Sequence, residues 1–165
     1  MSTSEADPAV LIIGYGNPLR GDDGVGWRVA EKLEESLRRP DVRVMACHQL
    51  LPEMAEPISR AKLVIFIDAS VADAPGEIAC REIHPAAGAD SAAELASHDL
   101  GPPVLLATAR QLFGQSADGV IFSVGGEDFG MGEQLSPKVL QAADELVKRV
   151  EDYVARGAWS VERGA

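Results

Sequence analysis

Short apolar runs alternate with longer stretches in which apolar residues return every three or four positions. The runs are brief and rich in β-branched residues, so they predict buried strands. The longer stretches gather their apolar side chains on one face, which predicts amphipathic helices. The expected strands cover residues 10–14, 42–48, 62–70, 77–83 and 119–124, and the expected helices cover 25–37, 50–61, 102–113 and 137–154.

Strands that alternate with helices predict an α/β fold, a single three-layer domain with helices on both faces of a mostly parallel twisted sheet. We expect about five strands, with one antiparallel pair around the turn at 71–77. No linker divides the chain, so the domain is expected to span residues 1–165, with a core over about 10–154 and a loose tail over 155–165. In such sheets ligands bind outside the carboxyl ends of the strands.

Composition narrows the possible functions. The 165 residues are 46% hydrophobic and 25% charged, as in an ordinary globular domain, and carry a formal net charge of −11. This excess of acid argues against nucleic-acid or anionic-membrane partners. No run reaches the ~20 apolar residues of a membrane helix, and the polar start does not resemble a signal peptide, so we expect a cytoplasmic protein. Cys47 and Cys80 are expected to be reduced thiols in or near the core.

The turn after the first strand, "GYGNPLRGDDGVG" (residues 14–26), places two aspartates where a glycine-rich turn often holds phosphate. The dinucleotide pattern would need glycine or alanine where Leu19 stands, and the chain has no P-loop. The sequence therefore predicts no nucleotide cofactor. One aspartate, Asp22 or Asp23, is explained as a helix cap, which leaves the other unexplained.

Asp68 ends the most apolar strand, where a carboxylate needs hydrogen bonds or a cation. If Asp23 and Asp68 meet, two like charges ~4 Å apart repel by about 4 kcal/mol at an effective dielectric constant of ~20. A shared proton, the guanidinium of Arg20 or a metal ion would relieve that repulsion. The residue types alone leave all three open.

His98 lies in "SHDL", just before the helix expected at 102–113. Two carboxylates and one imidazole suit nickel, zinc, iron or manganese and leave coordination positions for a substrate. His48 and His84 are interpreted as surface residues. A rival interpretation makes Cys47 a thiolate nucleophile with a histidine as its base, although adjacent Cys47 and His48 would point to opposite sides of a strand.

The motifs "GYGNPLRGDDGVG", "VIFIDAS" and "SHDL", in this order, resemble those of the hydrogenase maturation endopeptidases. These proteases remove a C-terminal extension from the large subunit of nickel–iron hydrogenases. The resemblance spans about residues 10–154 and implies that Asp23, Asp68 and His98 are both the metal ligands and the catalytic residues. Some relatives have glutamate at the position of Asp23.

The resemblance also implies that nickel arrives with the large-subunit precursor, which is then the partner, and that the protease reads this nickel as a signal of complete assembly. The motif glycines would admit the substrate backbone. We further expect a monomer that holds little metal by itself. Two alternatives stay open: a metal-binding chaperone or scaffold that does not cleave, and a thiol hydrolase that uses Cys47.

Overall fold

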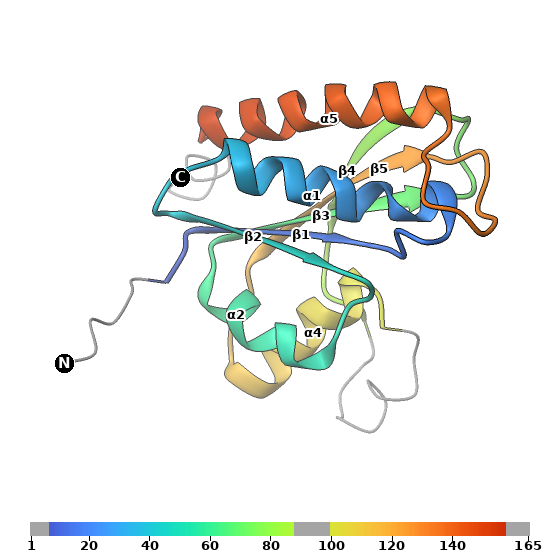
Figure 1. Ribbon diagram of the computed structural model, residues 1–165. Coiled ribbons are helices and arrows are strands. Elements are labelled where there is room, and N and C mark those ends of the chain that lie inside the picture. Colours follow the sequence, from blue (N-terminus) through green and yellow to red (C-terminus); the bar gives the residue numbers. More distant parts are fainter. Residues whose placement is uncertain (1–6, 88–99, 158–165) are drawn as a thin grey trace.

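Five strands form one mixed sheet in the order β2-β1-β3-β5-β4 (Figure 1). The computed structural model describes residues 7–87 and 100–157. All neighbouring strands are parallel except β4, which is antiparallel to β5. The strands are β1 (Val10–Tyr15), β2 (Val42–Cys47), β3 (Leu63–Ser70), β4 (Ile78–Ile83) and β5 (Asp118–Gly125). The expected mostly parallel sheet with one antiparallel strand is confirmed.

Helices cover both faces of this sheet, which confirms the three-layer α/β architecture (Figure 1). The helices α1 and α5 pack on one face, and α2 and α4 pack on the other. Their bounds are α1 (Val25–Ser36), α2 (Ala55–Arg60), α4 (Pro102–Phe113) and α5 (Pro137–Arg156). Among the described residues, none of these helices combines the length and apolarity needed to cross a bilayer.

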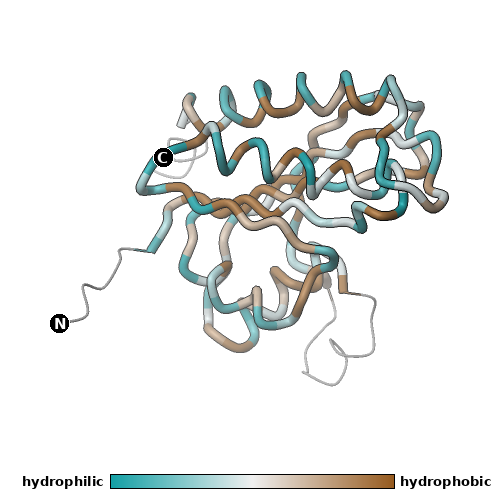
Figure 2. Tube along the Cα trace, in the orientation of Figure 1, coloured by the Kyte–Doolittle hydropathy of each residue, from teal (hydrophilic) through white to brown (hydrophobic). Residues whose placement is uncertain are grey.

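Side-chain alternation along the central strands divides the core into two clusters. Ile12, Ile65 and Ile67 pack with α1 and α5, whereas Leu11, Ile13 and Phe66 pack with α2 and α4. The hydropathy colours follow this arrangement, with apolar strands between helices whose turns alternate between polar and apolar (Figure 2). Because β1 and β3 are covered on both faces, they read as continuous apolar runs in the sequence.

Three local expectations need correction. The turn at 71–77 does not join a hairpin, because β5 lies between β3 and β4, and the antiparallel partner of β4 is β5. The stretch 50–61 contains a 3₁₀ turn (Pro52–Met54) and only six α-helical residues (Ala55–Arg60), with Pro57 in the first turn of this short helix. The final helix continues to Arg156, so residues 155 and 156 are not part of a loose tail.

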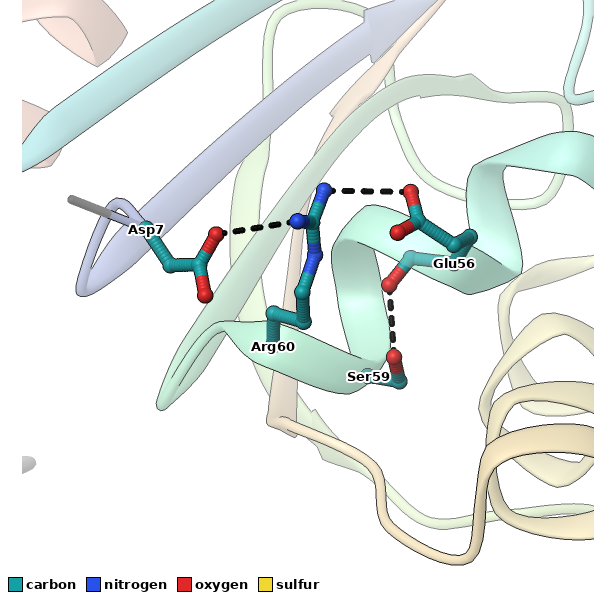
Figure 3. Close-up of polar contacts among 4 residues, drawn as sticks. All are labelled: Asp7, Glu56, Ser59 and Arg60. Atoms are coloured by element: carbon teal, nitrogen blue, oxygen red, sulfur yellow. Dashed lines mark hydrogen bonds and ion pairs between the residues drawn. The ribbon is translucent and has the colours of Figure 1, made fainter. Parts of the chain in front are cut away.

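The segment before β1 is tied to the end of α2 (Figure 3). Arg60 forms ion pairs with Asp7 and with Glu56, each at 3.1 Å, while the Ser59 hydroxyl donates to the Glu56 carbonyl. About half of each charged side chain is exposed, so these pairs contribute little stability. They lie where the chain enters β1, at the end of the sheet opposite to the candidate site.

Candidate functional site

The strand order reverses between β1 and β3, which are neighbours in the sheet but are separated in sequence by α1, β2 and α2. Connections leave this point toward opposite sides, and in sheets of this kind the ligand crevice lies outside the carboxyl ends of the two strands at such a point. Asp23 lies in the turn that follows β1, within the 3₁₀ segment Gly21–Gly24, and Asp68 lies near the carboxyl end of β3, two residues before its last residue. The topology therefore brings the two predicted carboxylates to the same edge.

Asp68 is partly buried and ionises with difficulty. Burial, the largest cause, and the negative charge of Asp23 together raise its pKa to about 6, against hydrogen bonds from the Tyr15 hydroxyl and the Ala69 N–H that lower it. The Ala69 N–H donates to Asp68 Oδ1 at 2.8 Å. The electrostatic effect of Asp23 on Asp68 shows that the two carboxylates are close enough to repel one another.

Asp23 is held by its own turn. Its Oδ2 accepts a hydrogen bond from the Asn17 N–H at 2.8 Å, while the Asn17 Oδ1 accepts from the Leu19 N–H at 2.9 Å. The side chain is half-buried. A carboxylate that accepts one backbone N–H retains most of its lone pairs for another partner.

The motif glycines serve the packing of the protein itself. A Cβ on Gly26 would lie 2.3 Å from the Ile67 carbonyl oxygen and 2.5 Å from that of Tyr15, and a Cβ on Gly14 would lie 2.1 Å from the Gly26 carbonyl oxygen. A Cβ on Gly16, whose φ is +142°, would likewise lie too close to the Asp23 carbonyl oxygen, at 1.9 Å. These glycines therefore let α1 and the motif turn pack closely, while their contact with a substrate backbone stays a prediction.

Asp22 is a structural residue. It is fully buried and accepts hydrogen bonds from the N–H groups of Glu127, Asp128 and Ser136 and from the Ser136 hydroxyl, at 2.7–2.9 Å. Burial alone would raise the pKa of Asp22, but these four donors together lower it below its ordinary value. The expectation that one of the two aspartates caps the following helix is wrong: the N-cap of α1 is Gly24 without a side-chain cap, and Asp22 instead binds the segment 127–136 before α5.

The sequence left Arg20 or a metal ion as possible cation partners of the Asp23 and Asp68 carboxylates. Among the described residues, no ion pair joins Arg20 to Asp23 or Asp68, and the Arg20 side chain is exposed. The described part of the chain also contains no group of three or more His, Cys, Asp or Glu side chains able to hold a metal ion. His98 lies outside the described residues. Asp23 and Asp68 thus form two-thirds of the predicted set, without a cation partner among the residues described.

Cys47 lacks the surroundings of a reactive thiolate. Burial raises the pKa of its half-buried thiol, and its Sγ lies 3.8 Å from the Gly14 carbonyl oxygen. The ring of His48 instead packs against Trp27, with centroids 4.8 Å apart. Cys80 is exposed on the edge strand β4, so the expectation that it lies in or near the core is wrong.

A hollow of about 730 Å³ lies away from these carboxylates, beside the edge strand β2 and the end of α1. Its walls include Leu37, Val42 and Met45, with Glu34 and Arg43 as the charged members. It contains no converging carboxylates, so the candidate site remains at the carboxyl ends of β1 and β3, where Asp23 and Asp68 lie.

Sequence reasoning missed two residues that flank Asp68. Gly14 pairs with Ile67, so Tyr15, the last residue of β1, comes beside Asp68, and Ser123 is the register partner of Asp68 on β5. The Ser123 hydroxyl is buried without a hydrogen-bond partner among the described residues. Once the strand order is known, the shared register is the signal that finds both residues.

The fold matches solved structures of hydrogenase maturation proteases. The NiFe hydrogenase maturation protease HycI from Thermococcus kodakarensis KOD1 is 25% identical, with 90% of this chain and 93% of that chain covered at a TM-score of 0.71. The hydrogenase 2 maturation peptidase from a Thaumarchaeota archaeon is 22% identical, with coverages of 88% and 97% and a TM-score of 0.67. The hydrogenase maturating endopeptidase HybD from E. coli is 20% identical, with coverages of 90% and 93% and a TM-score of 0.63.

No sequence-family model matches the chain, and no curated protein sequence matches it significantly. The similarity to the maturation proteases is therefore a similarity of fold over about nine-tenths of the chain. It agrees with the resemblance carried by the sequence motifs.

Proposed function

We propose that this protein, which shares the fold of the hydrogenase maturation proteases, is an endopeptidase that removes the C-terminal extension of a nickel–iron hydrogenase large-subunit precursor after nickel insertion. The observation that carries the proposal is the pair Asp23 and Asp68. These carboxylates repel one another at the carboxyl edge of the sheet, and no cation partner for them exists among the described residues. Such a pair is suited to a metal ion that arrives with a substrate.

The proposed nickel ligands are Asp23, Asp68 and His98. The position of α4 supports the choice of His98. Only four residues separate the end of α4 from β5, so α4 ends near the amino edge of the sheet, and its 12 residues extend about 18 Å back toward the carboxyl edge. Leu100, two residues after His98, packs against the same apolar cluster as Tyr15, the neighbour of Asp68.

In this proposal the nickel ion belongs to the precursor, and the three side chains complete its coordination. Two carboxylates and one imidazole are too few ligands for a tightly held structural ion, which is consistent with transient binding. The same residues are proposed to act in peptide hydrolysis. A carboxyl group whose pKa is about 6, like that of Asp68, can accept a proton from an attacking water near neutral pH.

The test is a cleavage assay on a large-subunit precursor prepared with and without nickel, read by mass spectrometry. We expect loss of the C-terminal peptide only from the nickel-loaded precursor. Asp68→Asn, Asp23→Asn and His98→Ala should each abolish the loss, whereas Asp144→Asn, which removes an exposed carboxylate on α5, should not. Gel filtration of the free protein should give a monomer.

The same assay separates the proposal from its alternative. If the protein binds the precursor and never shortens it, it is a chaperone or scaffold and not a protease. If it cuts both precursors equally, it is a protease that does not read nickel.

A further inference from the structure

The Tyr15 hydroxyl donates a hydrogen bond to the Asp68 carboxylate. Both residues are partly buried, and the Tyr15 ring packs edge-on against Phe66, with centroids 6.4 Å apart at 87°. Phe66 lies two residues before Asp68 on β3, so it points to the same face of the sheet. The phenol thus lies between the Phe66 ring and the Asp68 carboxylate, to which its hydroxyl is bound.

The strand register explains this contact. Ile13 and Phe66 belong to the cluster beneath α2 and α4, so Tyr15 and Asp68, each two residues further on, face that side as well. Because Gly14 is paired with Ile67, the next residues on the two strands come side by side at the rim of the crevice. From this position on β1, the hydroxyl at the far end of the Tyr15 ring can reach the Asp68 carboxylate.

Two donors of different origin therefore hold Asp68. The Ala69 N–H binds Oδ1 from the strand, and the Tyr15 hydroxyl approaches from the neighbouring strand. The torsion that turns a carboxylate is soft, so a carboxylate without partners samples many orientations. Two fixed donors select one orientation, and since an ionised carboxylate has about four lone-pair sites, it can still bind a cation.

We propose that Tyr15 is a positioning residue, whose hydroxyl fixes the orientation in which Asp68 binds the metal ion. The inference rests on the proposed function, because it takes Asp68 as a metal ligand. Groups that hydrogen-bond to metal-binding carboxylates typically change metal affinity about 10–100-fold when they are removed. Tyr15 acts through Asp68 and does not itself touch the metal ion or the scissile peptide.

The experiment compares Tyr15→Phe with Tyr153→Phe in the full chain. Phe keeps the ring contact with Phe66 and removes only the hydroxyl. Tyr153 is the only other tyrosine, and its ring packs edge-on against Phe122 in the opposite core cluster. The probe is Co²⁺ alone, whose visible absorption reports both its affinity and its coordination geometry, with Ni²⁺ as a competitor. Thermal unfolding monitors the fold.

We expect Tyr15→Phe to bind Co²⁺ about 10–100-fold more weakly than wild type and to shift its absorption at saturation, while Tyr153→Phe matches wild type in both. Equal affinity and an equal spectrum for Tyr15→Phe and wild type would overturn the positioning role. Unfolding of Tyr15→Phe at 25 °C would overturn it as well, because the hydroxyl would then be a requirement of the fold.

Failure of the proposed function looks different. In that case wild type leaves the nickel-loaded precursor intact, whatever Tyr15→Phe does to Co²⁺ binding. If wild type cleaves, Asp68→Asn loses both Co²⁺ binding and cleavage, and Tyr15→Phe behaves as wild type, only the role of Tyr15 is wrong.

Discussion

Asp22 and Asp23 are joined by a peptide bond, yet they have opposite environments. Asp22 is fully buried among four hydrogen-bond donors, whereas Asp23 is half-buried, accepts one N–H and repels Asp68. Asp22 therefore stabilises the fold, whereas Asp23 belongs to the candidate site. Their substitutions should have separable effects.

Asp22→Asn should destabilise the protein by about 3 kcal/mol, because an amide turns an N–H₂ group toward N–H donors and leaves buried groups unpaired. The lowered pKa of Asp22 means that its stabilisation is fully present above the ordinary value of 3.8 and is lost as pH falls through its lower value in the folded state. Urea unfolding at neutral pH measures the loss. Asp23→Asn is the control, and an equal loss there would show that Asp22 has no special structural role.

Asp68→Asn should stabilise the free protein at pH 7.5 by about 3 kcal/mol, since each unit of pKa shift corresponds to about 1.4 kcal/mol. The pKa of Asp68 is raised from 3.8 to about 6, so the cost of ionising it is absent below pH 3.8, grows between these values and is complete above about pH 6. Urea unfolding at pH 3.5 and 7.5 tests this. A gain of the same size at both pH values would contradict the electrostatic cause.

Gly26→Ala should destabilise the protein by about 3 kcal/mol or more, because the new Cβ meets two backbone carbonyl oxygens that cannot move without displacing α1 from the sheet. Gly101→Ala is the matched control, since among the residues that the structure describes its Cβ meets only Pro103 Cδ at 3.9 Å, and its φ of −110° suits alanine. Thermal unfolding compares the two. A mild effect at Gly26 would mean that α1 tolerates displacement and that the glycine has another role.

Cys47→Ala should leave cleavage of the precursor within about threefold of wild type, because burial raises the pKa of this thiol and keeps it protonated. Alkylation by iodoacetamide should modify the exposed Cys80 well before Cys47. Peptide mass mapping over a time course, with Cys80→Ala as the control, checks the order. Rapid loss of activity on modification of Cys47 would favour the thiol-hydrolase alternative.

The central elements were predictable because their residues have few other options. The short, β-branched apolar run from Leu63 to Ile67 is typical of a covered strand, and the four-residue spacing from Val25 to Leu33 is typical of a helix with one buried face. From these elements and the rule for parallel sheets, the placement of Asp23 and Asp68 at the same edge of the sheet could be predicted. What the pattern cannot give is strand order, which depends on contacts between distant segments. The partner of β4 was therefore assigned wrongly, and Tyr15 and Ser123 were overlooked.

The hydrogen bonds of Asp22 have a consequence for biosynthesis. Its donors lie 105 to 114 residues further along the chain, and the same segment pairs with the motif turn through Gly132 and Leu19. The turn that carries Asp23 can therefore acquire its full set of native contacts only after Ser136 has been synthesised. Long-range contacts of this kind form late in folding. A nascent chain that has not yet reached Ser136 thus lacks part of the contacts that order the turn carrying Asp23.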